Sequence, residues 1–324
     1  MLEEILNDLP PGFADPALLV GRETNDDAAV YLIDEDKAVV ATTDFFMPVV
    51  DDPFDFGRIA AANALSDIYA VGARPLFALA LVGMPVDKLG AATVSRILSG
   101  GVDICGAAGI AVGGGHSIDS PEPIYGLAVV GLIDPALIKR NNTARPGDVL
   151  ILGKGLGVGI LCAALKADKL DPGAYSEIIE TATRLNDIGM ELAERDAVHA
   201  MTDVTGFGLI GHLMEICRGS GLGASIELDA LPILRSAPGL ARAGFNTGAG
   251  TRNRETWQDR VSLPDGLAEW RRNLLYDPQT SGGLILTVEA DAAEDLLGLF
   301  HGRDYADARI IGQLEPGEAH ITVR

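Results

Sequence analysis

Four aspartates stand out because each lies beside a predicted end of a strand or a helix. They are Asp27, Asp44, Asp67 and Asp203. No Ser-His-Asp order accompanies them, and the whole chain has only five histidines. Carboxylates gathered without His or Cys are typical ligands of hard cations, above all Mg²⁺, which commonly holds the phosphates of a nucleotide. These residue types predict metal-assisted chemistry on ATP.

The stretch from Thr42 to Asp67 has to position two of these aspartates. Residues 42–44 follow the apolar run 38–41, so we expect hydroxyls and a carboxylate at the end of a strand, where α/β folds place their sites. A helix is predicted next. It sets Asn63 above Asp67, because residues four apart share a helix face. The alternative is a solvated stripe on an amphipathic helix.

Asp27 and Asp203 each admit a plainer interpretation. Asp27 ends the run Asn25-Asp26-Asp27 ahead of a predicted strand at 28–33, and such residues also build ordinary turns. Asp203 follows a short apolar run and precedes a predicted helix at 209–218, where an acidic residue can serve as a helix cap. Only the four aspartates together predict a metal site.

A glycine-rich loop is predicted at residues 113–117, with the sequence Gly-Gly-Gly-His-Ser. Glycines let backbone N–H groups approach an anion closely, so the loop resembles a phosphate cradle in composition. It lacks the Lys-Ser/Thr ending of a P-loop and the spacing of a dinucleotide fingerprint. A tight turn between two elements explains the same residues equally well.

The elements that must position these residues alternate between strands and helices, which predicts an α/β or α+β fold with mixed sheets and helices packed on them. Further strands are expected at 77–83, 124–133, 149–152 and 284–288, and helices at 91–108 and 176–195. The segment 235–265 is expected to be irregular. A polar loop at 141–148 predicts two domains, 1–145 and 146–324.

The composition excludes several classes of protein. A formal charge of -21 argues against nucleic acid as a partner, although divalent cations can still bridge an acidic surface to an anionic ligand. The three cysteines have neither zinc nor disulfide spacing. No signal peptide is recognised, and the longest uncharged apolar run, 75–86, is too short for a membrane span. A cytoplasmic protein is expected.

Six motifs, in order along nearly the whole chain, closely resemble the selenophosphate synthetase family, also called selenide, water dikinase. They begin at Thr24 (TNDDAA), Thr42 (TTDFFMP), Asn63 (NALSDIYA), Gly114 (GGHSID), Met201 (MTDVTGFG) and Asp277 (DPQTSGG). The family belongs to the superfamily of aminoimidazole ribonucleotide synthetase, thiamine-monophosphate kinase and a hydrogenase maturation protein. The second, fifth and sixth motifs favour the selenide enzyme over these relatives.

The resemblance implies a two-domain fold like that of aminoimidazole ribonucleotide synthetase and a homodimer built through the N-terminal half. It implies that ATP, selenide and water give selenophosphate, AMP and phosphate. Positions matching Asp27, Asp67 and Asp203 would carry Mg²⁺, so metal and nucleotide would contact both domains. The nucleotide contacts would come from Thr24, Asn25, Asp26, Asp44, Asp67, Gly115, His116 and Ser117.

One family feature has no counterpart in the sequence. The family carries a Gly-rich segment with a catalytic Cys or selenocysteine and then a Lys, ahead of the region that matches Met1. Without those groups the chain is expected to make little or no selenophosphate. Two alternatives stay open: a non-catalytic nucleotide-binding paralogue, and another kinase of the superfamily that acts on a small metabolite and turns over without selenide.

Overall fold

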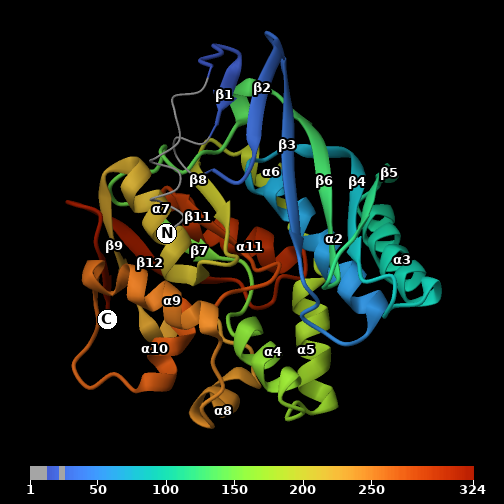
Figure 1. Cartoon of the computed structure of the whole chain (residues 1–324). Coiled ribbons are helices and arrows are strands. Elements are labelled where there is room, and N and C mark those ends of the chain that lie inside the picture. Colours follow the sequence, from blue (N-terminus) through green and yellow to red (C-terminus); the bar gives the residue numbers. More distant parts are fainter. Residues whose placement is uncertain (1–12, 22–25) are drawn as a thin grey trace.

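The computed structural model describes residues 13–21 and 26–324, which form two β-sheets with helices packed on them (Figure 1). The first sheet has the strand order β1-β2-β3-β6-β4-β5. Only β4 and β5 pair in parallel, so the sheet is mixed. Its strands are β1 (Leu18–Val20), β2 (Ala29–Asp34), β3 (Lys37–Phe46), β4 (Arg74–Met84), β5 (Ala111–Asp119) and β6 (Ile124–Ile133).

The second sheet has the order β10-β13-β9-β12-β7-β11-β8 and is also mixed. Its strands are β7 (Val149–Leu152), β8 (Val198–Asp203), β9 (Leu222–Ile226), β10 (Val261–Ser262), β11 (Leu284–Val288), β12 (Arg309–Pro316) and β13 (Ile321–Val323). Consecutive β7 residues alternate between two cores, because strand side chains point to opposite faces. The predicted α/β (α+β) class with mixed sheets is confirmed.

Helices cover one face of the first sheet and both faces of the second. On the first sheet lie α2 (Pro53–Ala70) and α3 (Ala91–Ala107). The others are α4 (Val158–Lys166), α5 (Pro172–Ala182), α6 (Ile188–Ala193), α7 (Gly208–Ser220), α8 (Ala237–Arg242), α9 (Gly248–Trp257), α10 (Glu269–Tyr276) and α11 (Ala293–Gly302), with 3₁₀ turns η1 (Pro135–Leu137), η2 (Leu228–Ala230), η3 (Gln258–Arg260) and η4 (Ala290–Ala292).

Helix α2 lies between the two sheets in Figure 1 and carries the polar residues of the predicted site. It begins at Pro53 because Asp52 caps it: the Asp52 side chain accepts hydrogen bonds from the backbone N–H groups of Phe54 and Asp55. Proline is also well suited to a first helical position. Asn63 is only 4% exposed. The alternative of a solvated stripe is therefore wrong: these polar groups face the second half of the chain.

Residues 42–44 and 113–117, expected at a strand end and in a loop, both lie inside strands. Strand β3 continues to Phe46, so Thr42 and Asp44 lie inside it and not at its end, because β6 pairs with it along this whole length. Residues 113–117 are not a loop between elements. They belong to β5, which pairs in parallel with β4 at the sheet edge, and the backbone angles of Gly114 and Gly115 accommodate an irregularity in that pairing.

Two further predictions about elements were wrong. The single helix expected at 176–195 is two helices, α5 and α6, because the segment between them turns to contact other parts of the chain through Asn186. The segment 235–265 is largely helical. Its helix α9 starts at the Thr247 cap and buries Trp257 against the second core, which sequence periodicity did not reveal.

Helices α2 and α3 meet closely at glycines. A Cβ atom on Gly100 would lie 2.1 Å from the Phe54 carbonyl oxygen, and one on Gly57 would lie 1.9 Å from that of Ile97. Neither backbone can yield without shifting a helix. Since α2 carries site residues, this contact also sets where they lie.

We predict that Gly100→Ala lowers the free energy of unfolding by about 1–3 kcal/mol, because the added methyl group overpacks the helix contact. Gly106→Ala, on the same helix but with open space around its Cβ position, is the matched control. It should stabilise the protein by up to about 1 kcal/mol through helix propensity. Urea unfolding measures both, and equal effects of the two variants would contradict the packing argument.

Candidate metal and nucleotide site

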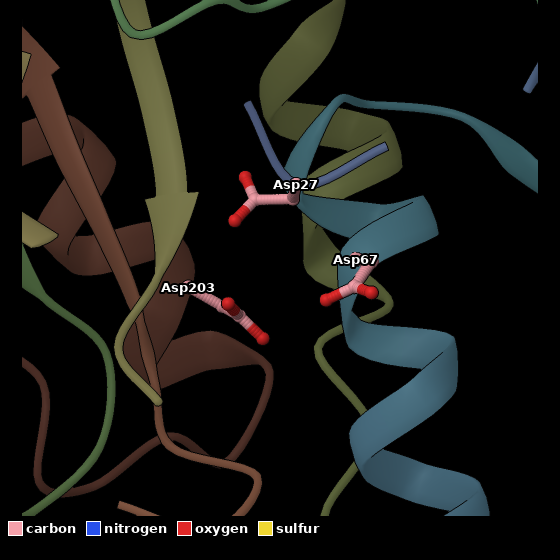
Figure 2. A group of neighbouring side chains, drawn as sticks. All are labelled: Asp27, Asp67 and Asp203. Atoms are coloured by element: carbon pink, nitrogen blue, oxygen red, sulfur yellow. The ribbon is translucent and has the colours of Figure 1, made fainter. Parts of the chain in front are cut away.

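Asp27, Asp67 and Asp203 come together where the two halves of the chain meet (Figure 2). Asp27 precedes β2, Asp67 lies on α2, and Asp203 ends β8. One oxygen from each carboxylate lies within 4.8 Å of the others. Figure 2 shows Asp27 and Asp67 facing Asp203 across the space between their elements. The plainer interpretations of Asp27 as a mere turn residue and Asp203 as a helix cap do not describe this geometry.

A neighbouring hydroxyl group donates to each of these carboxylates. Thr202 Oγ1 donates to Asp27 Oδ1 at 2.7 Å, and Thr42 Oγ1 donates to Asp67 Oδ2 at 2.5 Å. Ser66 Oγ donates to Asp203 Oδ2. These bonds orient the carboxylates, and every carboxylate oxygen has further lone pairs for another ligand.

The electrostatics of this cluster favour a cation. Burial raises the pKa of Asp27 well above its usual range, and the charges of Asp203 and Asp67 raise it further. Burial and the charges of Asp203 and Asp44 likewise raise the pKa of Asp67. Burial also raises the pKa of Asp203, against the opposing hydrogen bond from Ser66. A divalent cation among three oxygen ligands would stabilise the ionised forms, so the donor set fits Mg²⁺.

Asp44 lies beside this cluster and is held by α2. Asn63 Nδ2 donates to Asp44 Oδ2, and burial raises the pKa of Asp44 to about 6 with a contribution from the charge of Asp203. Asn63 also accepts a hydrogen bond from the Ser281 backbone N–H at 2.7 Å. The side chain thus connects the first sheet to a loop of the second half.

Of the other predicted nucleotide contacts, Asp26 lies beside the carboxylate cluster. Asp26 adjoins Asp27 and accepts a hydrogen bond from the Asn141 backbone N–H at 2.7 Å. Together with Asp27, Thr42 and Thr43 it lines an open hollow beside the cluster. Thr24 and Asn25 lie outside the described residues.

Gly115, His116 and Ser117 lie on the far edge of the first sheet. Cross-strand pairing runs from Gly115 through Ala80 and Leu127 to Asp44, so three strand spacings, about 14 Å, separate the ends of this row. Leu127 is fully buried against α2. The structure therefore does not bring these three residues to the carboxylates of the same chain. They line a separate, largely apolar cavity of about 340 Å³ between β5 and α3.

Sequence reasoning missed several polar residues around the cluster. Ser66 and Thr202 each directly precede an aspartate of the set, and that adjacency was the available signal. Asn186, Lys154 and Ser281 gave no signal, because their partners lie far away in the sequence.

The glycine-rich segment 153–159 leads into α4, and the first N–H groups of that helix have acceptors within the chain. Gln279 Oε1 accepts from the backbone N–H groups of Gly157 and Val158 at 3.0 and 3.1 Å, and Asp277 Oδ2 accepts from that of Ile160 at 3.3 Å. The DPQTSGG motif therefore caps the N-terminus of α4 from within the chain.

Comparison with known proteins gives two family-model matches. The AIR synthase related protein N-terminal domain matches residues 25–133, and the C-terminal domain matches residues 145–323. A selenide, water dikinase of Paraburkholderia xenovorans is 52% identical over 323 residues, covering 100% of this chain and 91% of that protein. One of Dechloromonas aromatica is 53% identical, covering 100% and 93%.

Solved structures share the fold at low sequence identity. A thiamine-monophosphate kinase from Stenotrophomonas maltophilia is 22% identical with a TM-score of 0.71, covering 95% of this chain and 91% of that one. The hydrogenase maturation protein HypE in complex with ATP is 19% identical with a TM-score of 0.67, covering 99% and 90%. The expected fold of the superfamily is confirmed. Among the residues that the structure describes, no helix combines the length and apolar character of a membrane span.

The raised pKa values predict how stability depends on pH. Carboxylates with raised pKa values keep protons in the folded chain where the unfolded chain has lost them, so the free energy of unfolding falls as the pH rises from about 4 through the raised values. Without divalent cations, the melting temperature should be about 3 °C or more lower at pH 8 than at pH 5.5.

Mg²⁺ should restore much of this loss at pH 8, because it binds the ionised carboxylates of the folded chain. Asp203→Asn should reduce both the pH dependence and the Mg²⁺ effect, whereas Asp307→Asn, at an exposed position, should change neither. Scanning fluorimetry with and without EDTA measures these shifts. A melting temperature that rises with pH in EDTA would refute the electrostatic description of the cluster.

Proposed function

The chain belongs to the selenide, water dikinase family of the AIR synthase related proteins, and we propose that its reaction is the synthesis of selenophosphate from ATP, selenide and water, with AMP and phosphate as the other products. The little or no turnover expected from the sequence stays a prediction. Identity above 50% over the full chain supports this reaction. The structural observation that carries it is the group of Asp27, Asp67 and Asp203, because it joins both halves around one place for a cation.

The proposed ligands of Mg²⁺ are these three aspartates. ATP carries up to four negative charges, and without a cation the carboxylates would repel it. Mg²⁺ neutralises charge on the phosphates and on the phosphoryl group that is transferred. The hydroxyl groups of Thr42, Ser66 and Thr202 hold the carboxylates in orientation. Asp26 and Asp44, and the residues Thr24 and Asn25 beyond the described part, are the proposed nucleotide contacts on this side.

Gly115, His116 and Ser117 are also proposed nucleotide contacts, and their distance from the cluster requires an explanation. A nucleotide bound at the carboxylates cannot reach Gly115 across the sheet of the same chain. The buried Leu127 lies between Asp44 and Gly115 in the cross-strand pairing. We propose that these residues contact a nucleotide bound by the other protomer of a homodimer. Each dimer would then have two equivalent composite sites.

The open face of the first sheet supports such a dimer. Tyr31, Phe45, Phe77, Leu79 and Ile118 are exposed by 42%, 51%, 39%, 38% and 56%. Tyr31, Phe45, Phe77 and Leu79 point away from α2 and α3, opposite to their buried strand neighbours. Contiguous exposed apolar groups of this kind mark interaction surfaces. A second copy of the same face would bury them in a two-fold arrangement.

We predict that Asp67→Asn and Asp203→Asn each weaken Mg²⁺-dependent ATP binding at least 10-fold, because each removes a charged ligand of the cation. Asp103→Asn, on the outer surface of α3, should leave it within twofold. Titration calorimetry with and without Mg²⁺ measures binding, and ³¹P NMR follows AMP and selenophosphate. Turnover of ATP that needs no selenide would contradict the proposed reaction, and unchanged binding in both variants would contradict the proposed ligands.

Phe45→Glu should reduce dimerisation at micromolar concentration, because it places a charge in the centre of the proposed apolar interface. Light scattering coupled to size exclusion gives the mass. Phe207→Glu, which changes a 40% exposed side chain at the start of α7 in the second half of the chain, is the control. A monomeric wild-type chain, or an unchanged dimer in Phe45→Glu, would remove this interface from consideration.

A further inference from the structure

Lys154 is a buried lysine whose hydrogen bonds join two distant segments of the second half. It follows β7 and is 3% exposed. Its Nζ donates to the Arg184 carbonyl oxygen at 2.7 Å and to the Ser281 carbonyl oxygen at 2.9 Å. The first acceptor lies between α5 and α6, and the second lies in the loop ahead of β11. The site described above assigns no role to this lysine.

Both segments that Lys154 joins also contact helix α2. The Ser281 backbone N–H donates to Asn63 Oδ1 at 2.7 Å. Asn186, two residues after Arg184, donates from Nδ2 to Ser66 Oγ at 2.7 Å and to the Gly282 carbonyl oxygen at 2.8 Å. The two segments are therefore connected to each other and to α2.

Each of these α2 residues leads directly to a carboxylate of the site. Asn63 donates to Asp44, and Ser66 donates to Asp203. Lys154 is thus linked to Asn63 through Ser281, and to Ser66 through the 184–186 segment.

The loop at 281–283 follows a path that leaves little room for adjustment. Ser281 has a φ of 52°, in the left-handed region that non-glycine residues rarely adopt. A Cβ atom on Gly282 would lie 2.0 Å from the Val204 carbonyl oxygen, and one on Gly283 would lie 2.3 Å from the Lys154 backbone nitrogen. The bond from Lys154 to the Ser281 carbonyl is one of the contacts that maintain this strained path.

The chemistry of the amine suits a geometric role. Burial lowers the pKa of Lys154 to about 7, although the charge of Asp203 opposes this effect. A neutral amine has two N–H groups, and two carbonyl acceptors are in place. The lysine can therefore hold both segments without a buried charge.

We propose that Lys154 is a positioning residue of the nucleotide–metal site, which it supports by holding the 184–186 and 281–282 segments against Asn63 and Ser66 of α2. This inference rests on the proposed function for its effect on nucleotide binding. The structural connection itself can be tested without any ligand.

The test uses Lys154→Met, which keeps most of the side-chain volume and removes both N–H donors. Lys139→Met is the matched control, because Lys139 Nζ also donates to two carbonyl oxygens, those of Arg195 and Val198 at 3.1 and 2.8 Å, but away from Asn63 and Ser66. Amide hydrogen exchange of the ligand-free chains reports on the Ser281 N–H. Titration calorimetry reports on the binding of Mg²⁺–ATP.

We expect Ser281 to exchange at least tenfold faster in Lys154→Met and to be unchanged in Lys139→Met. Mg²⁺–ATP should bind at least tenfold more weakly to Lys154→Met and within twofold of wild type to Lys139→Met. Asn63→Ala should weaken the binding of Mg²⁺–ATP similarly. The double variant Asn63→Ala with Lys154→Met should bind Mg²⁺–ATP as tightly as the single variant of lower affinity, since both substitutions act through one connection.

Unchanged Ser281 exchange in folded Lys154→Met, or fold-changes that multiply in the double variant, would overturn the proposal. Equal losses of binding in the two lysine variants would do the same, since they would indicate general destabilisation. If Lys154→Met does not fold, Lys154→Gln retains two N–H donors and should restore slow Ser281 exchange relative to Lys154→Ala. A wild-type chain that does not bind Mg²⁺–ATP would refute the proposed function, while the exchange measurement would still decide the role of Lys154.

Discussion

The mutual repulsion of Asp27, Asp67 and Asp203 is the constraint on which the rest of this structure depends. Two ionised carboxylates at a separation near 4.8 Å repel each other by on the order of 3 kcal/mol at an effective dielectric constant of 20. Burial increases the cost of their charges. Such a group is sustained by protonation or by a cation. The proposed Mg²⁺ would provide the second of these, and an anionic ligand would then arrive together with the metal.

The polar residues around the cluster also connect the two halves of the chain. Helix α2 presents Asn63 and Ser66 to the second half, and each of these buried groups has partners there. Because an unpaired buried polar group is costly, the contact between the halves is specific as well as close. The two halves must be in register for Thr202 to reach Asp27 and for Ser66 to reach Asp203. The carboxylate cluster and the contact between the halves are thus parts of one arrangement.

Similar sequence features have opposite roles in the two halves. The segment 153–159 is as rich in glycine as an anion loop, yet the N–H groups of Gly157 and Val158 already donate to Gln279, and that of Ile160 donates to Asp277. The glycines at 113–115 lie in an edge strand and line an accessible cavity. The difference arises from which acceptors the fold places nearby. A glycine-rich segment binds an external anion only where its N–H groups have no internal partner.

The sequence alone determined the residue types of the site, because carboxylates beside predicted strands and helices can be recognised locally. It also determined most strands, helix α2 and the family, whose motifs are contiguous. Only the tertiary structure decided that Asp27, Asp67 and Asp203 meet. It also decided that Lys154, Asn186 and Ser281 are connected to them through hydrogen bonds to one another and to α2. It also decided that residues 113–117 form an edge strand and that 235–265 is largely helical. The physical reason is that these features depend on hydrogen-bond and packing partners far away in the sequence, which local periodicity cannot reveal.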